Sequence, residues 1–449
     1  MISKKIKFYI SALAFFLILL LGPGLQGEPV LAMPPVHRTV LSNGLVFLFA
    51  EEHSLPFLTF QLLVDAGSRR DPAGMEGLAH LTAKGLLQGT SRRTVTAINE
   101  ELDFMGASLS TSSGRDYSTL NLRVLSKDFD RGFDLFLEAL TQSIFPEKEL
   151  QRQVAETSAA IQSEEDQPGE VAEKVFQKNL FPASPYGHPV EGTRESLGRI
   201  NRKSVLQFYR DYYHPGQAIL AVTGDLTPEE AKAKLLPRLD KWSPGKIRKD
   251  AVNTGFARGP KRIPINRQIS QANIILGHEG VSRENPDYYA LSVMNYILGG
   301  GGLSSRLMKE IRNKKGLAYS VASFFAPAKY SGSFQIVLQT KNATAREAIS
   351  LASGQMERIR KEQVSAKELE GAQKYLIGSF PMRLDTQGKL VNFLAQVEYF
   401  NLGLDYPKKY PTLIGSVSRE EVLRVAQKYL HPEEVLLVVV ANLKEAGIE

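Results

Sequence analysis

One stretch of the chain carries residues whose types and spacing could bind a metal. His80 lies in a predicted helix that begins near Met75 and is closed by Gly89. Positions 83 and 84 fall on the same helix face as His80. Two histidines at positions 80 and 84 could chelate one zinc ion, and a glutamate at 83 could act as general base. The sequence has Ala83 and Lys84 instead, and a charged ammonium has no lone pair to offer a metal.

Hairpins and amphipathic helices are predicted around this stretch. Residues 36–51 are typical of a hairpin because Asn43-Gly44 favours a two-residue turn. The predicted elements that follow are a strand over 58–66, a helix over 94–105, a hairpin over 106–124, a helix from 126, a helix over 146–165 and a strand over 218–223. The mixture predicts an α+β fold.

The last part of this pattern occurs twice. Residues 197–226 align without gaps on residues 414–443, with ten identities in 30 positions. Each copy reads as a helix, a Tyr-x-His-Pro turn and an apolar strand, which predicts a structural role for His214 and His431. We therefore expect two homologous halves, an N-terminal one over 36–243 and a C-terminal one over 262–449, joined by a linker over 244–261.

The N-terminus is typical of an exported protein. Lys4, Lys5 and Lys7 precede an apolar run over 8–21, and Val30-Leu31-Ala32 offers small residues at a cleavage site. This predicts a signal peptide over 1–32, with an uncleaved anchor as the alternative, and a periplasmic or extracellular location in a bacterium. No later segment has the length of a membrane span.

Composition excludes several other classes of protein. The chain has no cysteine, which rules out disulfides, thiolate zinc sites and a thiol nucleophile. Its net charge of +7 over 449 residues is too diffuse for a nucleic-acid partner.

Three stretches together resemble one family. They read GSRRDPAGMEGLAHLTAKGLLQGT over 67–90, IQSEEDQPGEVAEKVFQKNLFPASPYGHPVEGT over 161–193 and LGGGGLSSRLMKEIRNKKGLAYSV over 298–321. With the duplicated halves, they resemble the pitrilysin/insulinase family of inverted-motif zinc peptidases, which includes the mitochondrial processing peptidase. The resemblance implies two α/β-sandwich halves, each a mixed, mostly antiparallel sheet with helices on one face, that form half of a clamshell.

In active members two histidines and a distant glutamate hold zinc, and a further glutamate acts as the base. Here His80 matches the first histidine, Ala83 stands at the base position and Lys84 at the second histidine. Counting back from the turn at Asp166-Gln167-Pro168 places Ala160 at the distant glutamate. The resemblance thus implies a degenerate zinc site and no metal on this chain. His80 is expected to be a satisfied, partly buried histidine.

The second half keeps a different part of the family's machinery. Arg312 and Tyr319 flank a Lys-Gly-Leu turn between a predicted helix over 303–312 and a predicted strand over 317–326. The family places an arginine and a tyrosine in this context, where they reach the substrate at the zinc site of another half. Both side chains can donate hydrogen bonds to the oxyanion that develops at an attacked peptide carbonyl.

The sequence therefore predicts an exported, zinc-free subunit of a heterodimeric metallopeptidase. Its expected partner is a homologous chain that bears the HxxEH motif and carries the zinc, and the expected substrate is an extended peptide. Proteolysis is expected only with that partner. The alternative is a catalytically inactive peptide-binding or scaffold protein of the same fold. No other cluster, such as His188 with Glu191 or His278 with Glu279, supplies a replacement metal site.

Overall fold

Two β-sheets, one in each half of the chain, form the framework of the fold. The computed structural model describes residues 33–248 and 254–448, so the predicted signal peptide lies outside the described residues. The N-terminal sheet has the strand order β1-β2-β6-β3-β5-β4, in which only the β2–β6 pair is parallel. Its strands are β1 (Val36–Val40), β2 (Val46–Glu51), β3 (Phe57–Val64), β4 (Ser108–Ser113), β5 (Ser118–Leu125) and β6 (Ala218–Gly224).

The helices of the N-terminal half pack largely through aromatic and aliphatic side chains. They are α2 (Leu78–Gly85), α3 (Val95–Met105), α4 (Phe129–Thr141), α5 (Glu147–Glu165), α6 (Pro168–Leu180), α7 (Arg194–Leu197), α8 (Arg202–Tyr212) and α9 (Pro228–Leu239). Phe133 of α4 stacks on Phe60 of β3, with 5.4 Å between ring centroids, and both rings are fully buried. The three- and four-residue spacing of phenylalanines on α4 explains this contact, because those positions share one helix face.

The C-terminal half repeats this plan with five strands. The order is β7-β11-β8-β10-β9, and only the β7–β11 pair is parallel. The strands are β7 (Lys261–Asn266), β8 (Gln271–Glu279), β9 (Ala318–Pro327), β10 (Gly332–Lys341) and β11 (Leu436–Ala441). The helices are α10 (Tyr288–Asn295), α11 (Ala345–Lys361), α12 (Ala366–Gly378), α13 (Gln387–Tyr399), α14 (Tyr406–Gly415), α15 (Arg419–Tyr429) and α16 (Leu443–Ala446). The predicted α+β fold of two similar halves is confirmed.

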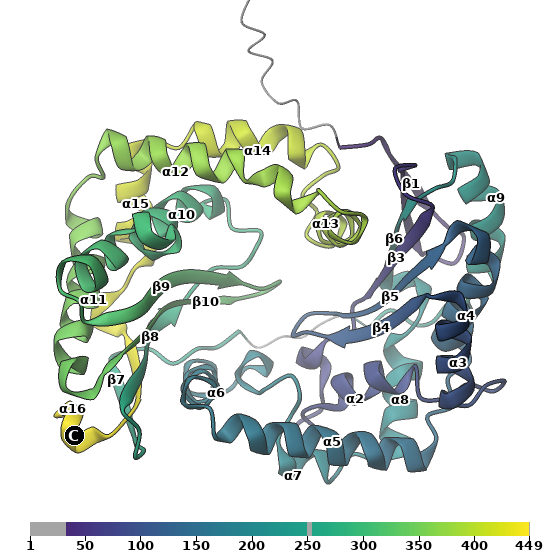
Figure 1. Cartoon of the computed structure of the whole chain (residues 1–449), viewed down its shortest axis with the longest axis horizontal. Helices are drawn as coiled ribbons and strands as arrows, with labels where there is room; N and C mark the ends of the chain where they lie inside the picture. Colours follow the sequence, from purple (N-terminus) through teal and green to yellow (C-terminus); the bar gives the residue numbers. More distant parts are fainter. Residues whose placement is uncertain (1–32, 249–253, 449) are drawn as a thin grey trace, which may run out of the picture. The chain divides into compact units, whose positions relative to one another are not determined.

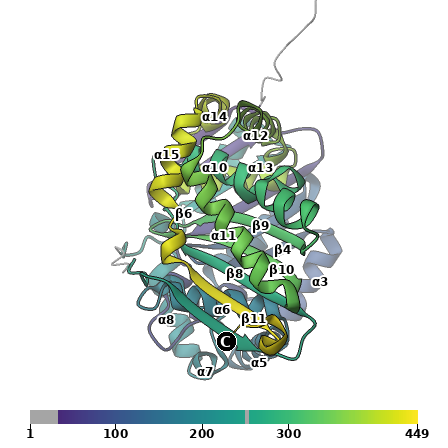
Figure 2. The ribbon, with the colours of Figure 1, turned by 90° about the vertical axis from the view of Figure 1, so that its left-hand side faces the viewer.

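The two halves exchange one helix each. Helix α6 of the N-terminal half packs against β8 and β11, and α13 of the C-terminal half packs against β3 and β6 (Figure 1). Figure 2 shows α10, α11 and α15 in front of the C-terminal sheet. Each sheet has the helices of its own half on one face, as the resemblance implies. A helix of the other half covers the opposite face, which the resemblance did not indicate.

The two exchanged helices meet their sheets through different chemistry. Phe176 and Leu180 of α6 are buried in an apolar cluster with Val438 of β11. On α13, in contrast, Gln387 accepts a hydrogen bond from Thr59 at 3.0 Å, and Asn392 accepts one from Gln61 of β3 at 3.0 Å. Burial of apolar area therefore fixes α6, whereas polar pairs orient α13.

Two predicted helices differ from those observed. Helix α2 begins at Leu78 because Gly77 takes a left-handed conformation with φ of 97°. Asp71 caps this late start by accepting hydrogen bonds from the N–H groups of Gly77 and Ala79 at 2.8 and 2.7 Å. The helix predicted over 303–312 is irregular, with a π-helical turn at Met308–Lys314. Within the described residues, no helix is both long enough and apolar enough to cross a membrane.

Candidate functional site

The degenerate metal position lies on α2. His80 is half-buried, and its Nε2 atom is buried without a hydrogen-bond partner within the described residues. The expectation of a satisfied histidine is therefore wrong for this nitrogen. Burial lowers the pKa of His80, the nearby charge of Lys84 lowers it further, and Glu191 opposes the change. The imidazole is consequently neutral at physiological pH.

The other positions of the degenerate site offer no metal ligand. Ala83 is buried, and Ala160 is exposed on α5, which packs against α2. Gln153 and Thr157 on the buried face of α5 each have a side-chain oxygen that is buried without a partner within the described residues. One imidazole, one ammonium and two methyl groups do not make up the ligand set that zinc requires. Residues 33–248 and 254–448 hold no group of three or more potential ligands placed to bind a metal ion.

We expect the purified chain to bind no stoichiometric zinc. After incubation with zinc and removal of the unbound metal, elemental analysis should find less than about 0.1 zinc per chain, because a catalytic site needs three protein ligands. Replacing His80 by alanine should leave that value unchanged. Zinc near one per chain that is lost in the His80 variant would contradict the prediction.

Arg312 and Tyr319 are brought together by a turn between helix and strand. Gly316 adopts φ of 64°, and its N–H group donates to the Arg312 carbonyl at 2.9 Å, which ends the π-helical turn. The Arg312 guanidinium carbon then lies 5.5 Å from the centre of the Tyr319 ring. A contact of this kind between a cation and an aromatic face keeps the two side chains close.

Both side chains present free donors at a cavity. The cavity has a volume of about 490 Å³, and its lining includes Arg312, Tyr319, Gly302 and Gly169 of the N-terminal half. Tyr319 is 80% exposed, and no carboxylate within the described residues forms an ion pair with Arg312. The pair can therefore donate hydrogen bonds to an oxyanion on a bound molecule. His80, Ala83, Lys84 and Ala160 do not line this cavity.

Histidines outside the degenerate site have structural partners. His278 is buried, its Nδ1 atom lies 2.7 Å from the Glu279 carbonyl oxygen, and its Nε2 accepts from the His431 N–H at 3.1 Å. Burial lowers the pKa of His278 to about 4, so the ring is neutral and uses both nitrogens. His188 likewise lies 2.9 Å from the Pro189 carbonyl oxygen through Nδ1. The buried His214 places Nε2 3.1 Å from the Asp211 carbonyl oxygen.

A buried charged network between the halves was missed by sequence reasoning. Asp65 forms ion pairs with Arg69, Arg70 and Lys329, and Lys329 comes from the turn between β9 and β10. Burial would raise the pKa of Asp65, but the three cations outweigh burial and lower it. The spacing of Asp65, Arg69 and Arg70 was a local signal for part of the network. Nothing in the sequence linked it to Lys329.

The chain is similar to known proteins over most of its length. Residues 46–194 match the family model "Insulinase (Peptidase family M16)", and residues 199–376 match "Peptidase M16 inactive domain". An uncharacterized zinc protease of Streptomyces coelicolor is 26% identical, covering 90% of this chain and 89% of that protein. A protein of Helicobacter pylori named as a non-peptidase homolog is 24% identical, covering 96% of this chain and 99% of that protein.

A solved structure agrees with these matches. The crystal structure of a peptidase M16 inactive domain from Pseudomonas fluorescens superposes with a TM-score of 0.84 at 28% identity, covering 90% of this chain and 98% of that one. The two family models, this shared architecture and the retained sequence stretches lead to one conclusion. The chain belongs to the insulinase family of peptidases, family M16, and resembles its inactive members.

Proposed function

We propose that this chain is the exported, non-zinc subunit of a heterodimeric M16 peptidase. In this proposal it encloses a peptide substrate and supplies Arg312 and Tyr319 to the zinc site of a partner subunit, which carries its own HxxEH motif. The observation that supports it is the pairing of the half-buried Arg312 with the exposed Tyr319 at a cavity, in a chain that has Ala83, Lys84 and Ala160 at its own metal positions. The two donors could then act in catalysis only at a zinc ion that a partner subunit holds.

The two side chains have a defined chemical task in this proposal. During peptide hydrolysis, negative charge develops on the oxygen of the attacked carbonyl. The Tyr319 hydroxyl and the Arg312 guanidinium can donate to that oxygen, and both are already oriented by the turn at Gly316. Donors held in place before the reaction stabilise the transition state more than they stabilise the bound substrate. The partner subunit would supply the metal chemistry.

The edge strands of the two sheets support a peptide as the substrate. Strand β9, which begins at Ala318, is the last strand of the C-terminal sheet and includes Tyr319. Strand β4 is the last strand of the N-terminal sheet. An edge strand has unpaired backbone groups that can bind an extended peptide as an additional strand. A peptide bound along β9 would pass directly beside the Tyr319 hydroxyl.

One relative supports a second function for this chain, that of a non-enzymatic binding or scaffold protein. The Helicobacter pylori relative is named as a non-peptidase homolog, which favours an inactive peptide-binding or scaffold protein. Both functions predict a chain that does not cleave peptides when it is alone. They differ in whether a zinc-bearing homologue assembles with the chain and whether the assembly needs Arg312 and Tyr319.

Co-purification from the native cell envelope tests the proposal. A tagged chain should bring with it a homologue that bears the HxxEH motif, in near-equal amount. The recovered complex should cleave peptides, whereas the chain alone should not. Recovery without such a homologue, or a complex in which cleavage is absent, would favour the scaffold function.

A further inference from the structure

A second cavity lies between the two halves and has an unusual balance of charge. Its volume is about 840 Å³, within the range of small-molecule and peptide-residue sites. Its lining comes from the β4–β5 hairpin, the β9–β10 turn and α13, among other segments. Four cationic residues line it: Arg115, Arg283, Arg383 and Lys389. Asp116 is the single acidic residue among the lining residues.

The acidic residue is already committed to the protein. Asp116 accepts a hydrogen bond from the Tyr186 hydroxyl at 2.6 Å through Oδ1, and from the Lys329 N–H at 2.9 Å through Oδ2. The Nε atom of Arg69 lies 3.3 Å from Oδ1 as well. The carboxylate of Asp116 is therefore engaged by groups of the protein. Of the four cations, Lys389 pairs with Asp385 at 2.8 Å, whereas the three arginines form no ion pair with a carboxylate of the described residues.

The three arginines have no ion-pair partner within the described residues. Arg115 donates to the Tyr186 carbonyl, and Glu173 and Glu191 act on it only from a longer range. Arg283 stacks on Tyr288, with 3.8 Å from guanidinium carbon to ring centre, and donates to the Tyr406 hydroxyl at 3.2 Å. A guanidinium has five N–H donors, so both arginines keep donors for a ligand.

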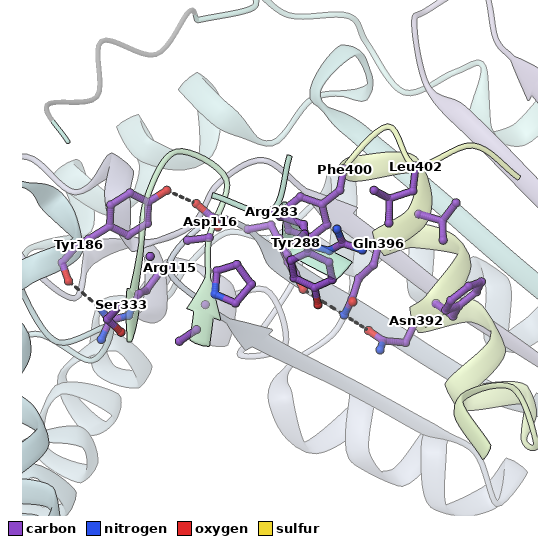
Figure 3. Close-up of a pocket in the computed structure, with 18 of the residues that line it drawn as sticks. Arg115, Asp116, Tyr186, Arg283, Tyr288, Ser333, Asn392, Gln396, Phe400 and Leu402 are labelled. Carbon is purple, nitrogen blue, oxygen red and sulfur yellow. Dashed lines mark hydrogen bonds between the residues drawn. The ribbon is translucent and has the colours of Figure 1, made fainter. Parts of the chain in front are cut away.

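The view in Figure 3 shows how these groups lie around the cavity. Arg283 and Tyr288 stand between Arg115 on one side and the α13 residues Asn392 and Gln396 on the other. Aromatic side chains provide much of the remaining wall; they are Tyr117, Phe181, Phe393, Phe400 and Tyr406. A planar guanidinium matches a carboxylate in a bidentate geometry, and the aromatic walls suit an apolar side chain next to it.

We infer that this cavity binds a carboxylate-bearing segment of a peptide, in which an apolar side chain neighbours the carboxylate. The carboxylate can be the peptide's C-terminus or the side chain of an aspartate or glutamate. The inference rests on the proposed function only in taking a peptide as the ligand. The cavity is complete within one chain, so binding is expected without a partner subunit.

Calorimetric titration of the full chain with three acetylated pentapeptides tests the inference. The probes are Gly-Ala-Gly-Ala-Phe with a free C-terminus, the same peptide as its amide, and Gly-Ala-Gly-Glu-Phe amide. At least one carboxylate peptide should bind, and the neutral amide should bind at least about 10-fold more weakly, the scale of a hydrogen bond to a charged group. The better carboxylate peptide identifies the source of the charge. Equal affinity for all three peptides, or binding by none, would overturn the inference.

Variants and salt locate the binding. Arg283→Gln and Arg383→Gln should each lower the affinity for the carboxylate peptide about 10-fold and leave the affinity for the amide peptide unchanged. Arg210→Gln, an exposed position on α8 outside the cavity, should change neither and serves as the matched control. Raising the salt concentration from about 50 to about 500 mM should weaken the binding of the carboxylate peptide to the unmodified chain. This measurement does not depend on whether a substituted chain folds. Affinity that responds neither to these arginines nor to salt would place the peptide elsewhere and overturn the inference.

Discussion

Replacing Tyr319 by phenylalanine in the assembled heterodimer is expected to lower kcat about 10²-fold, the usual loss for one oxyanion donor. The substitution removes the hydroxyl and keeps the ring that contacts Arg312. Tyr319 is 80% exposed, so the folded chain should tolerate the change with little loss of stability. Because the hydroxyl is proposed to act in the transition state, KM should change far less than kcat.

Arg312→Ala should have an effect of the same order, about 10²-fold or more. The guanidinium contributes a charge as well as donors, and it holds the tyrosine ring in place. The double variant should lose less than the product of the two single losses, because residues that act as a unit are not additive. Steady-state kinetics on a quenched fluorescent peptide would measure all three variants.

Tyr375→Phe is the matched control for both variants. Tyr375 is 57% exposed on α12 and does not line the cavity at Arg312. Removing the Tyr375 hydroxyl should leave kcat and KM within a factor of about two of the unmodified values, because most surface substitutions have small effects. Unchanged kinetics in the Tyr319 and Arg312 variants would remove the catalytic role and leave the scaffold function in its place.

Sequence reasoning worked where the signal was local. The hairpin at 36–51 is predicted because Asn43-Gly44 fixes its turn, and Gly44 does take φ of 90°. The repeat predicted two similar halves since α8 and α15 share their spacing of apolar residues. Arg312 and Tyr319 meet because one short turn separates them. In each case, residues close in sequence determine the result.

Contacts between distant segments could not be predicted in the same way. Nothing in the sequence of α13 indicates that it packs on the sheet of the other half, because its buried and polar faces would suit either sheet. The cavity that joins Arg115, Arg283 and Arg383 requires three segments to meet. The buried, unpartnered Nε2 atom of His80 could not be predicted either. Whether that nitrogen has a hydrogen-bond partner depends on which side chains the neighbouring helices place beside it.

Asp116 holds together three segments that are distant in sequence. It lies in the β4–β5 hairpin, and its carboxylate bonds the hydroxyl of Tyr186 and the backbone of Lys329 while pairing with Arg69. The Asp116 side chain is buried, and the Arg69 side chain is 0% exposed. Removing the Asp116 carboxylate leaves the Tyr186 hydroxyl and the Lys329 N–H without their acceptor, and it removes one of the two carboxylates that face Arg69, of which Asp65 remains. That cost exceeds the loss of one exposed ion pair, where water replaces the missing partner.

Asp116→Ala is therefore expected to lower the free energy of unfolding by about 3–5 kcal/mol, because each of the two donors left without an acceptor costs about 1–3 kcal/mol. Asp116→Asn should cost less, because the amide keeps one acceptor oxygen while losing the charge opposite Arg69. Asp103→Ala, at an exposed position of α3, should stay within about 0.5 kcal/mol and is the control. Urea unfolding followed by circular dichroism measures all three variants. If Asp116→Ala were as stable as the control, the network would add nothing to stability, and the halves would be held by the apolar packing of α6 and the polar pairs of α13.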